Sequence, residues 1–207
     1  MLQTKAQNNQ MSKRIIRASF NDDSIIVYQA FNRSIVESAV ANQTFVSPPF
    51  KVERMTWIKP SFSWMMYRSD WATKENQEHI LSIRLKREGF EWFLLNSCLA
   101  QYDHHLYGTP QNWKKELKHS AARIQWDPER DIFMQPLDYR AIQIGLTGIA
   151  VEKYISEYIT GIEDITDACH KIRQLIKEEK VNEALSLVPV ENAYLVSSQL
   201  ASKIDSN

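Results

Sequence analysis

The chain has 207 residues, with 25 Lys and Arg against 25 Asp and Glu, so its formal net charge is zero. This length suits one domain with a full hydrophobic core. With 43% hydrophobic and 24% charged residues, 5 Gly and 7 Pro, the composition excludes a disordered, collagen-like or low-complexity chain. Zero net charge also argues against a surface that binds polyanions over the whole molecule. The sum hides a polarity, because residues 1–149 hold 19 basic and 15 acidic residues and residues 150–207 hold 6 and 10.

The cysteines and the N-terminal segment bear on the cellular compartment in which we expect the protein. Cys98 and Cys169 lie in apolar or amphipathic segments without CxxC or histidine spacing, so we expect reduced structural thiols. Residues 1–13 are too polar for a signal peptide and are expected to form a loose leader. No apolar run reaches the ~18 residues that a membrane span needs. We therefore expect a cytoplasmic protein with no membrane partner.

The first half of the chain alternates strand and helix patterns. Strands are expected over 15–20, 25–31, 52–58 and 79–86, and helices over about 34–40, 61–71 and 90–102. Asn32 or Ser34 can cap the first helix, and Pro60 suits the start of the second. The strand over 25–31 is apolar on both faces except for Gln29, which is typical of a central strand.

In the second half, strands are expected over 122–126 and 140–146, and residues 113–120 read as helical or irregular. From residue 149 the apolar period becomes helical. The order predicts a single α+β domain over residues 14–190, of which about 149–190 is a helical C-terminal appendage, followed by a tail over 191–207. No GxGxxG follows a strand and no GxxxxGK[ST] is present, which excludes the usual dinucleotide and P-loop motifs.

The richest segment for binding chemistry covers residues 51–74. It holds three of the six tryptophans, Trp57, Trp64 and Trp71, together with Phe62 and Tyr67. It also holds five cations: Lys51, Arg54, Lys59, Arg68 and Lys74. Aromatic faces and fixed cations suit the base and the phosphates of a nucleotide, and Ser61 at a helix start can contribute to an anion site. The alternative is that these aromatic residues form a core-facing helix side, with Arg68 paired to Asp70 or to a distant acid.

A second group of candidates lies in RIQWDPERD, residues 123–131. We read it as a turn at a strand end, where Trp126, Asp127 and Arg130 are candidate substrate-binding residues and Glu129 a candidate base. The alternative is a structural turn held by an ion pair of Arg130 with Asp127 or Glu129.

Three polar side chains interrupt otherwise apolar strands: Arg17, Gln29 and Gln143. A buried polar group must find a partner or it costs a few kcal/mol. These residues therefore either stabilise the fold or line a cleft between sheets. The histidines show no zinc-binding spacing, so no metal is expected.

The segments RMTWIKPSFSWMMYRSDWATK (54–74), SIIVYQAFN (24–32), RIQWDPERD (123–131) and YRAIQIGL (139–146) resemble the family described as domain of unknown function 4291. The resemblance covers about residues 14–190. It implies a family and no reaction.

The order of elements is similar, at the level of the fold, to the ADP-ribosyltransferase superfamily. The resemblance implies small split mixed or antiparallel sheets flanked by helices, with NAD bound as co-substrate in the cleft between them. Gln29, beside Tyr28, would stand where a histidine often does, and Thr56, Ser61 or Tyr67 would supply the second motif. Gln143 would lie near the catalytic position that a glutamate usually holds. No Arg-Ser-Glu or His-Tyr-Glu triad is present as such, so a carboxylate would have to come from Glu129.

The leading hypothesis is therefore an NAD-dependent ADP-ribosyltransferase-like enzyme. Gln143 and Glu129 are the catalytic candidates, and Arg17, Lys59 and Arg68 would anchor phosphate. The acceptor, whether RNA, DNA, protein or small molecule, stays open. One alternative is a non-catalytic nucleic-acid or nucleotide-binding module that adds the basic segment 113–123. Another is a protein-interaction domain that uses the acidic segment 150–207.

Overall fold

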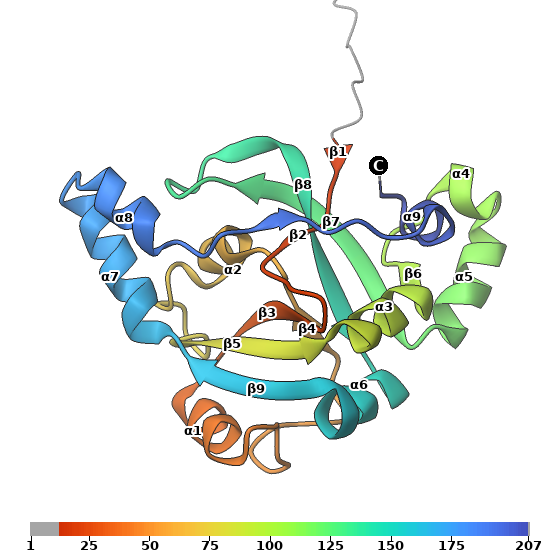
Figure 1. The fold of residues 1–207 in the computed structure, drawn as a ribbon. Coiled ribbons are helices and arrows are strands. Elements are labelled where there is room, and N and C mark those ends of the chain that lie inside the picture. Colours follow the sequence, from red (N-terminus) through yellow and green to blue (C-terminus); the bar gives the residue numbers. More distant parts are fainter. Residues whose placement is uncertain (1–12, 207) are drawn as a thin grey trace, which may run out of the picture.

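The computed structural model describes residues 13–206, so the expected leader lies outside the described residues except for Lys13. As predicted, the fold is α+β (Figure 1). The strands are β1 (Lys13–Arg14), β2 (Arg17–Ala18), β3 (Ser24–Phe31), β4 (Thr56–Ile58), β5 (His79–Lys86), β6 (Ser97–Leu99), β7 (Ala122–Arg130), β8 (Pro136–Leu146), β9 (Ile159–Asp164) and β10 (Asn192–Ala193). The helices are α1 (Arg33–Asn42), α2 (Phe62–Ser69), α3 (Arg87–Leu95), α4 (His104–Tyr107), α5 (Pro110–His119), α6 (Ile149–Lys153), the π-helix η1 (Tyr154–Tyr158), α7 (Thr166–Lys177), α8 (Val181–Leu187) and α9 (Ser198–Ile204).

Two sheets organise the molecule, and their strands run in crossing directions in Figure 1. In the five-stranded sheet, β8 pairs antiparallel with β7 along one edge. Along its other edge it pairs parallel with β1 and antiparallel with β4, and β6 extends the sheet as a parallel neighbour of β7. The three-stranded sheet has the order β3-β5-β9 and is antiparallel. The sheets meet where the Tyr28 N–H donates to the Lys59 carbonyl at 2.7 Å and the Lys59 N–H donates back at 3.2 Å.

Alternation along the strands explains which residues face the core. In β7 and β8, Ile124, Trp126, Ile142 and Ile144 are buried in the main apolar cluster. Their neighbours in the sequence point to the opposite face of the sheet because successive side chains alternate. This opposite face carries Gln125, Asp127, Gln143 and Gly145 from the two strands.

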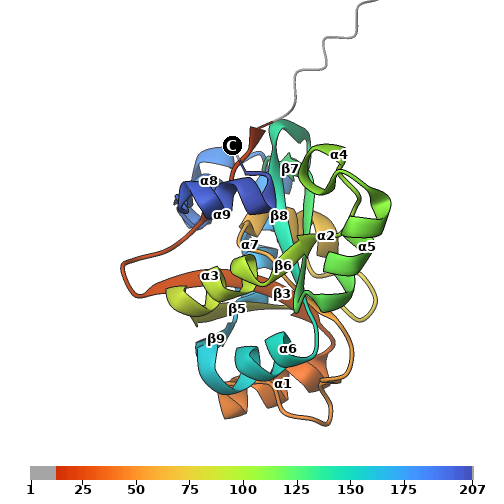
Figure 2. The ribbon, with the colours of Figure 1, turned by 90° about the vertical axis from the view of Figure 1, so that its right-hand side faces the viewer.

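The helices cover both sheets. On one side of β3, the side chains Ile25 and Val27 join Phe90 and Phe93 of α3 in the main core. On the other side, Tyr28 packs with Phe62 of α2 and with α7 in a second cluster. Figure 2 shows α4 and α5 beside β6, and α1 and α6 beyond β9. This coverage explains why β3 is apolar on both faces although it is an edge strand of its sheet, not the central strand that was expected.

The bounds of several helices and strands differ from those predicted from the sequence. Of the expected strand 15–20, only β2 at Arg17–Ala18 is a named strand, and β1, which precedes it, belongs to a different sheet. Of the expected strand 52–58, only β4 is a strand. The helix expected over 90–102 ends at Leu95, and the three buried residues of β6 follow it. Strand β7 continues through Pro128 to Arg130 with a register shift, so the expected turn at residues 127–130 lies inside a strand.

Residues 149–206 contribute to the sheets and to the hydrophobic core of the domain. Residues 149–190, expected as a helical appendage, also contain β9, whose Ile162 lies in the main core opposite Ile83. Residues 191–206, expected as a tail, pack on the body through the buried side chains of Tyr194, Leu200 and Ile204. These apolar residues are spaced far apart in a polar stretch of the sequence. The stretch therefore shows no clear helical or strand periodicity.

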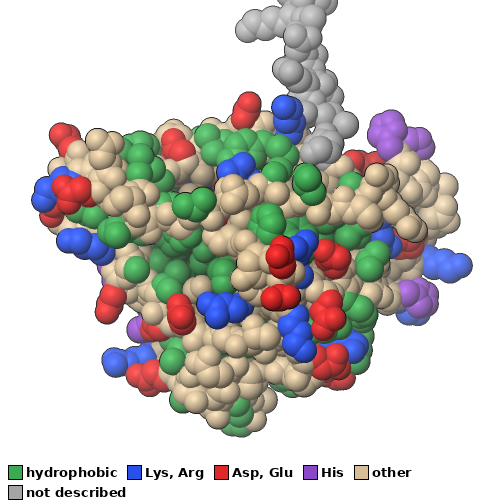
Figure 3. Space-filling model, in the orientation of Figure 1, with side chains coloured by type: hydrophobic (Ala, Val, Ile, Leu, Met, Phe, Trp, Pro, Cys, Tyr) green, Lys and Arg blue, Asp and Glu red, His purple; other side chains and the backbone are tan. Residues whose placement is uncertain are grey.

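Figure 3 shows that cationic and anionic side chains are mixed over the face seen in Figure 1, with apolar side chains between them. Val190 and Leu195 on the C-terminal segment are among the most exposed apolar residues, at 78% and 84%. No helix within residues 13–206 is long and apolar enough to cross a membrane. Both cysteines are free and buried.

Candidate functional site

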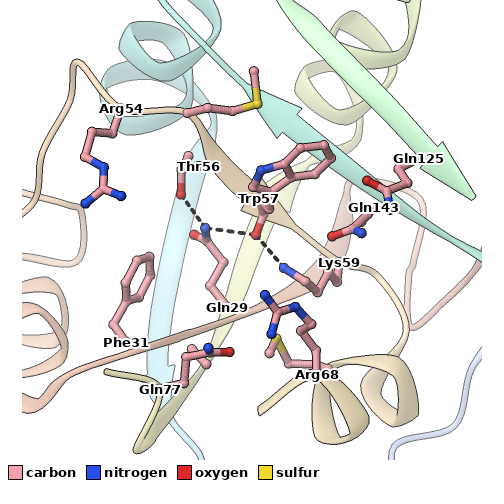
Figure 4. Close-up of a pocket in the computed structure, with 13 residues that line it drawn as sticks. Gln29, Phe31, Arg54, Thr56, Trp57, Lys59, Arg68, Gln77, Gln125 and Gln143 are labelled. Carbon is pink, nitrogen blue, oxygen red and sulfur yellow. Dashed lines mark hydrogen bonds between the residues drawn. The ribbon is translucent and has the colours of Figure 1, made fainter. Parts of the chain in front are cut away.

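A polar cavity of about 570 Å³ lies where β3, β4, β7, β8 and α2 meet (Figure 4). Its walls come from both sheets, so the junction between the sheets creates it. The lining residues are Gln29, Ala30, Phe31, Arg54, Met55, Thr56, Trp57, Lys59, Met65, Arg68, Gln77, Gln125 and Gln143. This size is ordinary for a site that holds a small organic ligand.

One wall is the polar face of the five-stranded sheet. Trp57 pairs with Gly145, and Gln125 lies directly opposite Gln143, so alternation brings these side chains and Lys59 to the same face. The Gln143 amide donates to Asp127 Oδ2 at 2.7 Å, and the Gln125 amide donates to Asp127 Oδ1 at 3.0 Å. Asp127 thus fixes two amides of the wall, although none of the thirteen lining residues is itself an acid.

Gly145 lets Trp57 lie flat against this wall. A Cβ atom at residue 145 would come within 2.8 Å of Met55 Sδ and 2.9 Å of Trp57 Cε2. Such contacts are too short for real Cβ atoms, so a larger residue would displace the indole. The absence of a side chain at residue 145 therefore shapes the cavity.

Gln29 joins the two sheets at the base of the cavity. Its amide nitrogen donates to Thr56 Oγ1 at 2.6 Å and to the Trp57 carbonyl at 3.1 Å. Its oxygen accepts the hydroxyl of Tyr154 in η1 at 2.8 Å. The side chain is 2% exposed, and all of this bonding is internal. Gln29 therefore acts in both of the ways that its position in an apolar strand predicts, as a structural residue and as part of the cleft wall.

Two cations, Lys59 and Arg68, extend into the same part of the cavity (Figure 4). Lys59 is 6% exposed, and its amine donates to the Trp57 carbonyl at 3.0 Å. Burial lowers the pKa of Lys59 to about 7; the charge of Arg68 acts in the same direction and Asp127 opposes it. The Arg68 guanidinium forms no hydrogen bond or ion pair with any residue of the described part of the chain, and Asp70 pairs with Arg173 instead.

A second cavity of about 580 Å³ adjoins the first. The two share Phe31, Arg54, Met55 and Thr56, so they form one groove along the sheet junction. The second cavity adds polar groups from the start of α1 and from the loops: Asn32, Ser34, Lys51 and Asn76. Arg54 lies where the two cavities meet.

A third, smaller cavity of about 310 Å³ meets the first at Gln125. It contains two of the three predicted substrate-binding residues, Trp126 and Asp127, together with Arg14, Asp103 and Arg140. The indole N–H of Trp126 donates to the Ile204 carbonyl at 2.8 Å, which joins β7 to the C-terminal helix. The third predicted residue, Arg130, lies elsewhere, 3.9 Å above the ring of Tyr67.

Of the predicted catalytic and cofactor-binding residues, five line the first cavity: Gln29, Thr56, Lys59, Arg68 and Gln143. Tyr28 is buried against Phe62, and Tyr67 is 38% exposed and stacks on Trp64. The aromatic residues of α2 thus pack mostly inward, as the alternative interpretation of residues 51–74 expected. Trp57 is the tryptophan of that segment that reaches the cavity.

The remaining three, Arg17, Ser61 and Glu129, belong to a different cluster at the N-terminus of α2. Ser61 caps this helix, and the Phe62 N–H donates to Glu191 Oε1 at 2.6 Å. Burial raises the pKa of Glu129, and burial with the nearby charge of Glu129 raises the pKa of Glu191 to about 8. Arg17 donates to the Glu191 carbonyl at 2.7 Å. This cluster attaches the C-terminal segment and lines none of the three cavities described above.

Several site residues had no distinctive sequence signal. Arg54 was only one of five cations in its segment, and Gln77 and Gln125 stood in unremarkable polar surroundings. Tyr154 reaches Gln29 from 125 residues away. A pairing of β7 with β8 would have indicated Gln125, because it places this residue opposite Gln143. Within residues 13–206, no group of three His, Cys, Asp or Glu side chains is arranged to hold a metal ion.

Comparison with known proteins identifies the family. An uncharacterized protein of Saccharomyces cerevisiae, YPR053C, is 26% identical over 76 residues, which is 37% of this chain and 42% of the yeast protein. The match thus spans less than half the length of that relative. The family model described as domain of unknown function (DUF4291) matches residues 15–194. Because this match covers most of the chain, including every residue that lines the groove, the chain belongs to the DUF4291 family.

Proposed function

We propose that the groove binds NAD and that the chain is an ADP-ribosyltransferase-like enzyme with NAD as co-substrate. The observation that carries this proposal is the groove itself. It lies between two small sheets that meet at the bridge between Tyr28 and Lys59, and it presents beside Lys59 the guanidinium of Arg68, which has no partner among residues 13–206.

The dimensions and the chemistry of the groove suit a dinucleotide. Each of the two adjoining cavities, of about 570 and 580 Å³, is large enough to hold one nucleotide half of NAD. Arg54 at their junction and Arg68 in the first cavity can hold the diphosphate, because a guanidinium stays charged and matches phosphate geometry. Trp57 lines the first cavity and offers an indole ring on which a base or the nicotinamide can stack.

Ribosyl transfer needs little more than this arrangement. Cleavage of the nicotinamide–ribose bond builds positive charge on the ribose, so the protein must hold the diphosphate, the ring and the ribose hydroxyls. The amide oxygen of Gln143 makes no hydrogen bond within the described residues, while its nitrogen is fixed by Asp127. Gln143 would orient a ribose hydroxyl, and Asp127 would supply negative charge behind it. Glu129 has no place in this scheme, because it does not line the groove.

Calorimetry with NAD tests the proposal. We expect saturable binding to the unaltered chain and at least about tenfold weaker binding for Arg68→Gln, because one charge-assisted phosphate contact contributes roughly 1.5–3 kcal/mol. Lys114→Gln is the matched control, since Lys114 is an exposed cation on α5 that lines none of the three cavities. Nicotinamide release is then measured for the chain alone and with RNA, DNA and protein acceptors.

No heat with millimolar NAD, together with identical behaviour of Arg68→Gln, would refute NAD binding. Tight binding of RNA or DNA that weakens steeply with salt, without turnover of NAD, would favour the alternative of a nucleic-acid-binding module.

A further inference from the structure

Lys59 is in an unusual position for a lysine. Its side chain is 6% exposed and lines a cavity, whereas lysines are almost never buried without a charged partner. Its amine has one hydrogen bond, to the Trp57 carbonyl at 3.0 Å, and no ion pair within the described residues. The amine is therefore positioned by one backbone acceptor and is otherwise open to whatever fills the cavity.

Burial and one of two charged neighbours disfavour the protonated form of this amine. Arg68, from α2, lies beside it in the cavity (Figure 4) and acts in the same direction as burial. Asp127, from β7, acts in the opposite direction while it is engaged by two glutamine amides. The other polar neighbours on the cavity wall, Gln29 and Gln143, are neutral. Burial is the largest effect, and together these influences lower the pKa of Lys59 to about 7.

We propose that Lys59 is a nucleophile, and that its amine condenses with the carbonyl group of an anionic ligand held in this cavity by Arg68. This property goes beyond the proposed function, because it does not require the ligand to be a nucleotide. A desolvated lysine next to a second cation is a recognised way to activate an amine for imine formation.

The reaction balances without a redox partner. The lone pair of the unprotonated Nζ attacks the carbonyl carbon, and the carbonyl electrons move to oxygen. A proton passes from nitrogen to that oxygen to give a carbinolamine. Loss of water then leaves a C=N double bond between Lys59 and the ligand, and hydrolysis reverses the sequence.

The geometry favours a ligand with both a carbonyl and a phosphate or carboxylate group. Arg68 extends into the same part of the cavity as Lys59, so one ligand can reach both (Figure 4). None of the thirteen described residues that line the cavity is acidic, so none of them repels an anion. An anion bound at Arg68 would neutralise the positive charge that acts against a second positive charge on the Lys59 nitrogen. The protonated imine, which carries its positive charge on that nitrogen, would then be stabilised.

Pyridoxal 5′-phosphate followed by borohydride reduction tests this proposal on the unaltered chain at pH 7. Reduction fixes each imine as a secondary amine, and a peptide map gives the labelled lysines. An amine with the ordinary lysine pKa of about 10.4 is unprotonated in only about one molecule in 2,500 at pH 7. We therefore expect Lys59 to be labelled at least about 100-fold faster than exposed Lys114, with a half-maximal rate near pH 7.

Two matched comparisons complete the test. Pyridoxal lacks the phosphate, and because its free hydroxymethyl group also closes on the aldehyde, the quantity compared is the ratio of Lys59 labelling to Lys114 labelling. This ratio is expected to be at least about tenfold lower with pyridoxal than with pyridoxal 5′-phosphate. Lys59→Arg keeps the positive charge and is expected to lose the cavity adduct but no labelling of the other lysines. Labelling of Lys59 no faster than Lys114, or the same ratio with the two aldehydes, would overturn the proposal. The map of the unaltered chain decides the main point even if the variant does not fold.

Failure here is distinguishable from failure of NAD binding. An unreactive Lys59 in a chain that binds NAD by calorimetry would refute the nucleophile alone. A reactive Lys59 in a chain with no affinity for NAD would refute the proposed function alone.

Discussion

Single polar side chains in apolar strands set the geometry of the groove. Gln29 is buried, yet both atoms of its amide are used in hydrogen bonds to Thr56, Trp57 and Tyr154. Burial of an amide costs free energy unless it is bonded, and here the bonds join β3, β4 and η1. The result is a rigid base to the groove, on which Trp57 and Lys59 are held at fixed positions.

The smallest residue of the wall is equally important. Gly145→Ala would place a methyl group 2.8 Å from Met55 Sδ and 2.9 Å from the Trp57 indole. We expect a loss of about 1–3 kcal/mol in the free energy of unfolding, because the indole must move out of a packed position. Urea denaturation measures this loss, and NAD affinity is expected to fall with it.

Gly161→Ala is the matched control for this substitution. A Cβ at residue 161 would meet its nearest atom, Arg84 Cβ, at 3.9 Å, which is ordinary van der Waals contact. Equal stability of the Gly145→Ala variant and the unaltered chain would show that Trp57 is not held by the close contact described above.

At this scale the sequence predicted part of the site. Gln29 and Gln143 could be found because a polar residue inside an apolar strand must be bonded or must face a cleft. Lys59 could be found as a cation of the aromatic-rich segment 51–74. Arg54 could not be singled out, since it lies in a turn where cations are common and nothing local distinguishes it. Arg17 was assigned to the cleft by the same reasoning as Gln29, and Glu129 from its place in RIQWDPERD, but these two residues bond to Glu191 and to the N-terminus of α2.

At the scale of elements, long alternating strands were the most predictable. Strand β5 has the predicted bounds, and β3 and β8 were recognised from their alternation or continuous apolar character. Strands β6, β9 and β10 were missed. β6 is three residues long and directly follows an apolar helix, and β9 contains Gly161 and three acidic or polar residues, so its pairing depends on the distant β5.

The C-terminal segment is held to the body by a buried carboxyl group. Glu191 accepts from the Phe62 N–H at the start of α2, and its own backbone carbonyl accepts from Arg17. Burial is the largest cause that raises its pKa to about 8; the bond from Phe62 and the charge of Arg17 oppose it, and Glu129 reinforces it. At neutral pH the folded chain therefore keeps a proton on Glu191.

This proton makes the stability of the fold depend on pH. A glutamate in the unfolded chain releases its proton near pH 4.3. The stabilisation from protonated Glu191 is therefore fully present below about pH 4, declines as the pH rises, and is lost above about pH 8. We expect Glu191→Gln, which stays neutral, to be more stable than the unaltered chain at pH 8 by about 1–3 kcal/mol, and to have a smaller decline from pH 5 to pH 8.

Urea denaturation at pH 5 and pH 8 measures this effect, with Glu75→Gln as the control because Glu75 is exposed. The expectation fails if the two variants show the same change in unfolding free energy between these pH values.

At the scale of the whole molecule, the zero net charge conceals a local arrangement. The cations that matter are gathered at the junction of two sheets, while the visible face of Figure 3 mixes charges of both signs. The basic residues of α5, Lys114, Lys115 and Lys118, line none of the three cavities. The α+β class followed from the order of elements, but the groove depends on how the two sheets meet. The bridge between Tyr28 and Lys59 and the hydrogen bonds of Gln29 to β4 hold the sheets together there.

A structure determined with saturating NAD tests the central claim most directly. We expect the dinucleotide to lie along the groove between β3 and β4, with its diphosphate within hydrogen-bond distance of Arg68 and Arg54 and one ring against Trp57. A groove that stays empty at saturating NAD, or NAD bound away from the junction of the two sheets, would contradict the account.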